Sequence, residues 1–172
     1  RRGPAPGARL ASHESRLGQP INALHASQAP RRLAVLGATG SIGVSALEVA
    51  AALPGRFQVV SLSAHRQWPG LHQQILTHRP RWAVLGDASA RPQADEIPAG
   101  TELLIGAHHL PERVRGSDVD VVLNAIVGAA GLASSLAALE AGKTLALANK
   151  ETLVLAGPMV MEQARRSGAR LL

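Results

Sequence analysis

The chain has 172 residues, of which 46% are hydrophobic and 17% are charged, and it contains no cysteine. This composition excludes a chain that is disordered overall, a disulfide framework, a thiolate metal site and a cysteine nucleophile. No uninterrupted apolar run approaches the roughly 20 residues of a membrane-spanning helix, so we expect no membrane partner.

The formal net charge of +6 is concentrated near the N-terminus. Residues 1–32 hold six arginines and one glutamate, whereas residues 33–172 hold twelve basic and eleven acidic residues. Residues 1–30 show no sustained helical or strand period and contain four prolines, so we predict a basic, disordered N-terminal extension. An arginine-rich leader can also be an organelle transit peptide, which leaves a plastid location open beside a bacterial cytoplasmic one.

Aromatic residues are scarce, because Phe57, Trp68 and Trp82 are the only ones in the chain. Proteins that bind single-stranded nucleic acid normally stack the bases on aromatic side chains. The basic charge therefore does not lead us to expect a nucleic-acid partner, and a nonspecific effect of the N-terminal extension remains the alternative.

From residue 31 onwards, short apolar runs alternate with segments of helical spacing. The runs predict strands at Arg31–Gly37, Gln58–Ser63, Trp82–Leu85, Glu102–Ile105, Asp120–Ala125 and Thr144–Ala148, and a further strand that begins at Arg170. The spacing predicts helices at Ser41–Leu53, Pro69–His78, Leu132–Ala141 and Glu151–Ser167, the last interrupted near its start by Gly157 and Pro158. This alternation predicts one Rossmann-like, doubly wound α/β domain over residues 31–172, with a mostly parallel sheet and flanking helices.

A glycine-rich loop, Gly37–Gly43 (GATGSIG), joins the first predicted strand directly to the first predicted helix. Gly37 permits a tight turn, Gly40 lets the backbone approach a pyrophosphate, and Gly43 lets the helix pack closely. The free N–H groups at the start of the helix can bind phosphate, and Thr39 and Ser41 can add hydroxyl donors. Its position between strand and helix favours a dinucleotide loop over a turn that serves only packing.

The second predicted strand leads into Ser63–Gln67 without the carboxylate that NAD-binding domains use to bind the ribose 2′-hydroxyl. Arg66 can instead pair with a 2′-phosphate through its planar set of donors. The sequence therefore favours NADP(H), with Arg66 as the main discriminator, over an arginine that is merely solvated.

Two later strand ends also carry candidate residues. The small, apolar residues 124–131 suit either a nicotinamide ring or a packing turn. Asn149, Lys150 and Glu151 can bind a cofactor and an anionic or carbonyl oxygen, or simply begin a helix, and their spacing alone does not decide between these roles. The seven histidines show no metal-ligand spacing, so we predict no metal site among them.

Three motifs together resemble the 1-deoxy-D-xylulose 5-phosphate reductoisomerase family: GATGSIG (37–43), NAIVGAAGL (124–132) and AGKTLALANKETLV (141–154). The resemblance implies the NADPH-binding part of a homodimeric enzyme of non-mevalonate isoprenoid biosynthesis. That family isomerises and reduces 1-deoxy-D-xylulose 5-phosphate to 2-C-methyl-D-erythritol 4-phosphate with the help of Mg²⁺ or Mn²⁺. A semialdehyde-dehydrogenase-like NADP reductase and a non-catalytic nucleotide-sensing domain are the alternatives.

The resemblance also implies roles for individual residues. By position, Thr39, Gly40, Ser41 and Ile42 would contact the NADPH phosphates, Arg66 and Gln67 the 2′-phosphate, Asn149 and Glu151 the cofactor, and Lys150 the substrate. His65 stands where the family usually has glycine. The chain stops at Leu172, before the family's acidic metal-binding segment, so we expect it to contain no metal ligands and to bind NADPH without turning over substrate.

Overall fold

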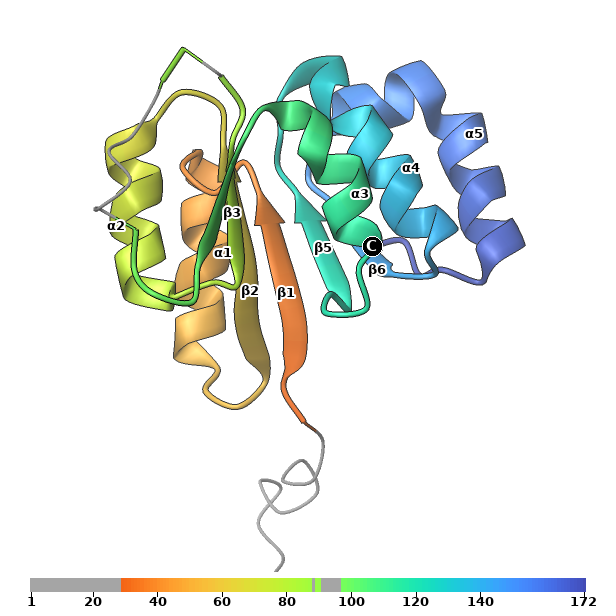
Figure 1. The fold of residues 1–172 in the computed structure, drawn as a ribbon. Coiled ribbons are helices and arrows are strands. Elements are labelled where there is room, and N and C mark those ends of the chain that lie inside the picture. The colour runs from red at the N-terminus through yellow and green to blue at the C-terminus, as the bar shows by residue number, and fades with distance from the viewer. Residues whose placement is uncertain (1–28, 88, 91–96) are drawn as a thin grey trace, which may run out of the picture.

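The computed structural model describes residues 29–87, 89–90 and 97–172, and it shows a sheet of six parallel strands (Figure 1). The strands are β1 (Arg31–Leu36), β2 (Phe57–Ala64), β3 (Trp82–Leu85), β4 (Glu102–Ile105), β5 (Val121–Asn124) and β6 (Thr144–Leu147). Their order in the sheet is β4-β3-β2-β1-β5-β6, and every pairing between neighbours is parallel. The predicted doubly wound fold is confirmed. Nearly all of the predicted N-terminal extension, residues 1–30, lies outside the described residues.

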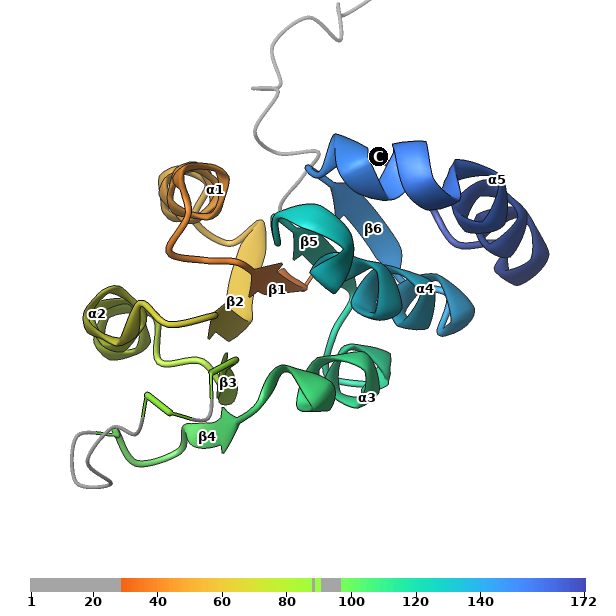
Figure 2. The ribbon, with the colours of Figure 1, turned by 90° about the horizontal axis from the view of Figure 1, so that it is seen from above.

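Helices cover both faces of the sheet (Figure 2). The α-helices are α1 (Ser41–Ala52), α2 (Trp68–His78), α3 (Leu110–Arg115), α4 (Leu132–Glu140) and α5 (Lys150–Ser167), and two short 3₁₀ helices are η3 (Ala107–His109) and η4 (Gly128–Gly131). Helices α1 and α2 lie on one face, and α3, α4 and α5 lie on the other. The right-handed crossovers of parallel strands require such a two-sided arrangement when the strand order reverses.

The central strand β1 supplies both hydrophobic cores. Because side chains alternate across a strand, Leu33 and Val35 pack with α1 and α2, while Ala34 and Leu36 pack with α3, α4 and α5. All four side chains are buried. A strand buried on both faces reads as a continuous apolar run, which is why this strand could be predicted from its sequence.

Helix α5 begins at Lys150 and bends in its second turn. Ala156 has a non-helical backbone (φ −136°, ψ 19°), and Pro158 follows inside the helix. Proline cannot donate the helical hydrogen bond and its ring crowds the preceding turn, so the interruption predicted at Gly157 and Pro158 is confirmed as a kink. The exposed apolar side chains of Val154 and Leu155 lie just before this bend.

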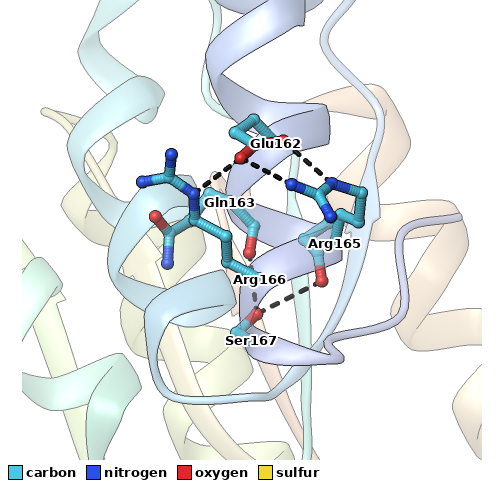
Figure 3. Close-up of polar contacts among 6 residues, drawn as sticks. Glu162, Gln163, Arg165, Arg166 and Ser167 are labelled. Carbon is cyan, nitrogen blue, oxygen red and sulfur yellow. Dashed lines mark hydrogen bonds and ion pairs between the residues drawn. The ribbon is translucent and has the colours of Figure 1, made fainter.

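The last turns of α5 hold a cluster of polar contacts (Figure 3). Glu162 accepts hydrogen bonds from Nε and Nη2 of Arg165, both at 2.9 Å, and from Nε of Arg166 at 2.6 Å. These bonds lower the pKa of the Glu162 carboxyl. The Ser167 hydroxyl donates to the Gln163 carbonyl at 2.9 Å. Two cations near the C-terminal end of the helix also suit the helix dipole.

The final residues form the start of a seventh parallel strand beside β6. The Leu145 amide donates to the Arg170 carbonyl at 2.8 Å, and the Leu172 amide donates to the Leu145 carbonyl at 2.9 Å. Leu145 and Leu171 form a parallel bridge. The strand predicted to begin at Arg170 is therefore confirmed.

An ion pair joins the amino ends of β1 and β5. Asp120 accepts hydrogen bonds from the backbone amide of Arg32 at 2.8 Å and from its Nε and Nη2 at 2.9 and 2.6 Å. The side-chain bonds from Arg32 are the main cause of a pKa lowered to about 2 for the Asp120 carboxyl. Asp120 therefore ties two adjacent strands together, at the sheet edge opposite to the glycine-rich loop.

Candidate dinucleotide-binding site

The glycine-rich loop lies where the strand order reverses. Strands β2, β3 and β4 follow one another on one side of β1, whereas β5 and β6 lie on the other. Parallel sheets bind ligands at such a point, beyond the carboxyl ends of the strands, which lie at the top of Figure 1. A cavity of about 370 Å³ opens there. Its lining comprises Gly37, Thr39, Gly40, Ser63, Ala64, His65, Gly86, Ala107, Leu110, Ala125, Ile126, Val127 and Ala130.

Two glycines of the loop have no room for a side chain. Gly37 has φ +79°, and a Cβ there would lie 2.8 Å from the Ala125 carbonyl oxygen at the end of β5. A Cβ on Gly43 would lie 2.4 Å from the Gly37 carbonyl oxygen and 2.6 Å from Cα of Ala38. The first turn of α1 therefore packs directly against the loop, as the glycine spacing predicts.

The loop is held in place from two neighbouring elements. In β2, Ser63 accepts from the Ala38 amide through its carbonyl at 2.7 Å and from the Gly37 amide through its hydroxyl at 3.2 Å. In α2, Nε2 of Gln74 donates to the Ala38 carbonyl at 2.8 Å. Ser63 was predicted only as the end of a strand. A buried serine facing a glycine loop is the signal that would have identified its second role.

The start of α1 is open to a ligand. Gly40 is the N-cap residue and has no side chain with which to accept hydrogen bonds from the amides of the first turn. Thr39 and Gly40 line the cavity, while Ser41 and Ile42 are exposed in the first turn of the helix. Unsatisfied amides and the positive end of the helix dipole together suit an anionic group such as phosphate.

Arg66 and Gln67 are exposed at the end of β2, and Arg66 forms an ion pair with Asp87 beyond the end of β3. The carboxylate of Asp87 also accepts hydrogen bonds from the amide and the hydroxyl of Ser89, at 2.8 and 2.7 Å. The bonds from Ser89, followed by that from Arg66, hold the pKa of the Asp87 carboxyl well below its ordinary range. Sequence reasoning missed Asp87, although an acid two residues after a buried strand is a usable signal.

Asn149 lies between β6 and α5 and is almost fully buried. Its Nδ2 donates to the carbonyls of Ile126 and Gly128 at 2.5 and 2.8 Å, and its Oδ1 accepts from the Glu151 amide at 2.8 Å. The side chain thus caps α5 and holds the segment after β5 at the same time. Lys150 and Glu151, the neighbours in the predicted cluster, are exposed in the first turn of α5.

The segment after β5 has a second internal support. Asn124 is fully buried, and its Nδ2 donates to the Gly131 carbonyl and the Ser135 hydroxyl at 2.7 and 2.8 Å. Its Oδ1 accepts from the Ile126 amide at 3.1 Å. Two buried asparagines therefore fix the course of residues 124–131, which form the apolar wall of the cavity. The interpretation of this segment as a packing turn is therefore confirmed, whereas its contact with a nicotinamide ring stays a prediction.

The part of the chain that the structure describes offers neither a metal-binding cluster nor a membrane-spanning helix. Within residues 29–87, 89–90 and 97–172, no group of three or more His, Cys, Asp or Glu side chains could hold a metal ion. These residues thus offer no ligand set that fits a divalent cation. In the same residues, no helix combines the length and the apolar character that crossing a membrane requires.

The reversal of strand order, the glycine-rich loop and the cavity together define a Rossmann-type domain, the class that binds dinucleotides in many oxidoreductases. Comparison with known families gives a narrower result. The model of the family described as 1-deoxy-D-xylulose 5-phosphate reductoisomerase matches residues 33–157. Because this match spans well over half of the chain, the chain belongs to the 1-deoxy-D-xylulose 5-phosphate reductoisomerase family, and the resemblance carried by the three motifs is confirmed.

Individual relatives agree with this assignment. The curated reductoisomerase of Cellvibrio japonicus is 49% identical over 147 residues, which cover 83% of this chain and 37% of that protein. A solved reductoisomerase from Zymomonas mobilis in complex with NADPH is 40% identical to this chain, with a TM-score of 0.77. The match covers 83% of this chain and 38% of the solved one. Another solved reductoisomerase, in complex with NADPH, fosmidomycin and magnesium, is 38% identical to this chain, with a TM-score of 0.77. This match covers 83% of this chain and 36% of the solved one. The chain thus spans a little over a third of the length of these relatives.

Proposed function

We propose that this chain is the NADPH-binding part of an enzyme that isomerises and reduces 1-deoxy-D-xylulose 5-phosphate to 2-C-methyl-D-erythritol 4-phosphate. The observation that carries the proposal is the close packing of Gly37 and Gly43 beside a cavity at the reversal of strand order. The NADPH complex of the Zymomonas mobilis relative supports the same cofactor. The alternatives, a semialdehyde-dehydrogenase-like reductase and a nucleotide-sensing domain, lack the support of the family match.

The described residues suit NADPH in distinct ways. The first-turn amides of α1, at Ser41 and Ile42, would bind phosphate together with Thr39 and Gly40. Arg66 and Gln67 would bind the 2′-phosphate, because they lie exposed at the end of β2. NADPH, when bound, supplies the hydride for the reduction.

The segment after β5 would exclude water from the reacting face of the cofactor, since Ala125, Ile126 and Val127 line the cavity there. Asn149 would serve the site by holding this segment through the Ile126 and Gly128 carbonyls. Glu151 would contact the cofactor from the first turn of α5. Lys150, exposed beside it, would hold an anionic oxygen of the substrate.

The properties of the whole enzyme are also part of the proposal: a phosphorylated sugar as substrate, Mg²⁺ or Mn²⁺ as cation, a homodimer, and a location in the bacterial cytoplasm. A solved relative that contains NADPH, fosmidomycin and magnesium supports the cation. Because the described residues offer no ligand set for a metal, we assign it no position among them. That this chain binds NADPH without turning over substrate stays a prediction.

Replacing Arg66 with glutamine tests the cofactor assignment. Charge-assisted hydrogen bonds contribute about 1.5–3 kcal/mol each, so Arg66→Gln should weaken NADPH binding by about 10- to 100-fold and leave NADH binding unchanged. Calorimetric titration with both cofactors measures the two affinities. Arg56→Gln is the matched control, since Arg56 is exposed in the turn before β2, at the opposite edge of the sheet. Equal binding of NADPH and NADH by the unmodified chain would contradict the assignment.

A further inference from the structure

The ion pair between Arg66 and Asp87 is unequal in exposure. The Arg66 side chain is 72% exposed, whereas the Asp87 side chain is 13% exposed. The carboxylate is anchored on its other oxygen, because Oδ1 accepts from both the amide and the hydroxyl of Ser89. The pair therefore consists of a fixed acid and an arginine that reaches into solvent from it.

The backbone sets this pairing independently of the side chains. Beyond the ends of β2 and β3 two further backbone hydrogen bonds join the two segments, since the Gly86 amide donates to the Ala64 carbonyl and the Asp87 amide to the His65 carbonyl, both at 2.8 Å. Residue 87 is thereby held alongside residues 65 and 66. The two partners are neighbours across the sheet, although 21 positions separate them in the sequence.

The contact leaves most of the guanidinium available. Arg66 uses its Nε–H to bond Oδ2 of Asp87. Arginine carries five N–H donors in one plane, so the four on its two terminal nitrogens stay outside this bond. A bond at Nε fixes the plane of the group and leaves the N–H donors on its other edges, which point away from the carboxylate, open to a ligand. A long exposed side chain without such a contact would sample many rotamers and lose that freedom on binding.

We propose that Asp87, anchored by Ser89, is a positioning residue that orients the Arg66 guanidinium for the 2′-phosphate and thereby contributes to the preference for NADPH over NADH. This inference rests on the proposed function, because it requires Arg66 to face that phosphate. The acid of NAD-binding domains has the opposite effect, since it bonds the 2′-hydroxyl directly. Here the Asp87 carboxylate already accepts hydrogen bonds from Arg66 and from the amide and hydroxyl of Ser89. These donors offset its negative charge and so reduce its repulsion of a phosphate.

The test measures the dissociation constants of NADPH and NADH for the 172-residue chain and its variants. Asp87→Asn should weaken NADPH binding about 3- to 10-fold, and Ser89→Ala about 2- to 3-fold, with NADH binding unchanged. In the Arg66→Gln background, Asp87→Asn should have no further effect on NADPH. Glu48→Gln removes the same charge from the exposed surface of α1 and should alter neither constant. Circular dichroism confirms that each variant is folded.

Four results would overturn this inference but not the proposed function: tighter NADPH binding by Asp87→Asn, equal losses for NADPH and NADH, an unchanged effect of Asp87→Asn when Arg66 is glutamine, or no effect of Asp87→Asn on either cofactor. The first would mean that the carboxylate repels the phosphate, and the second that it only supports the fold. A chain that prefers NADPH through Arg66 but is indifferent to Asp87 would leave the proposed function intact. A chain with no preference for NADPH would overturn both.

Discussion

Gly43→Ala should destabilise the chain by about 3 kcal/mol and abolish NADPH binding. The added Cβ would lie 2.4 Å from the Gly37 carbonyl oxygen, 2.6 Å from Cα of Ala38 and 2.8 Å from its carbonyl carbon. All three are backbone atoms, and Ser63 and Gln74 hold Ala38 by hydrogen bonds. The clash can therefore be relieved only by moving the helix away from the loop, which deforms the glycine-rich loop that is proposed to bind phosphate.

Gly157 provides the matched control for Gly43. A Cβ on Gly157 would meet no heavy atom within 4 Å. Gly157→Ala should therefore unfold at nearly the same urea concentration as the unmodified chain. Trp82 is 2% exposed, so its fluorescence can report unfolding. A Gly43→Ala chain within about 0.5 kcal/mol of the unmodified one would show that the helix does not pack on the loop as described.

Asn149→Ala should lower the free energy of unfolding by about 2–4 kcal/mol. It should also weaken NADPH binding, because the segment after β5 loses the side chain that holds it. The substitution removes the N-cap of α5, a loss of about 1 kcal/mol. It also leaves the half-buried carbonyls of Ile126 and Gly128 without their amide donor, at about 1–3 kcal/mol. Urea unfolding and a NADPH titration measure the two effects separately.

Asn149→Asp separates the two functions of this side chain. Aspartate caps a helix as well as asparagine does, but it cannot donate to the two carbonyls and would turn a carboxylate oxygen toward them. We therefore expect Asn149→Asp to be at least as destabilising as Asn149→Ala at neutral pH. Gln163→Ala, on the same helix, is the control for loss of an amide side chain. An aspartate variant as stable as the unmodified chain would mean that only the cap matters.

The parts of the fold that could be predicted are those in which a local pattern has one physical cause. The run Arg31–Gly37 is apolar because β1 is buried on both faces, and the glycines of its loop are close to other backbone atoms. The kink in α5 follows from Pro158. Helix α3 was missed because six residues are too few to show a helical period, even though Leu110 and Val114 are both buried on one side of it.

The contacts of the candidate site could be predicted only in part, because they join residues that are distant in sequence. Arg66 was identified from its position after β2, but its partner Asp87 follows a different strand. Asn149 was identified as a polar residue at a strand end, whereas its hydrogen bonds to residues 126 and 128 depend on how β5 and β6 lie side by side. Parallel strands meet at one edge of the sheet only after folding, so sequence spacing does not contain these pairs.

The central claim is that NADPH binds at the reversal of strand order, and amide chemical-shift mapping of the 172-residue chain tests it most directly. On titration with NADPH, we expect the largest shifts in residues 37–43, 64–67 and 125–130, and none around Gly55 and Asp120 at the opposite edge of the sheet. NADH should shift the first and third segments but not Arg66 to the same extent. Shifts confined to the opposite edge, or no saturable shifts with NADPH, would contradict the account.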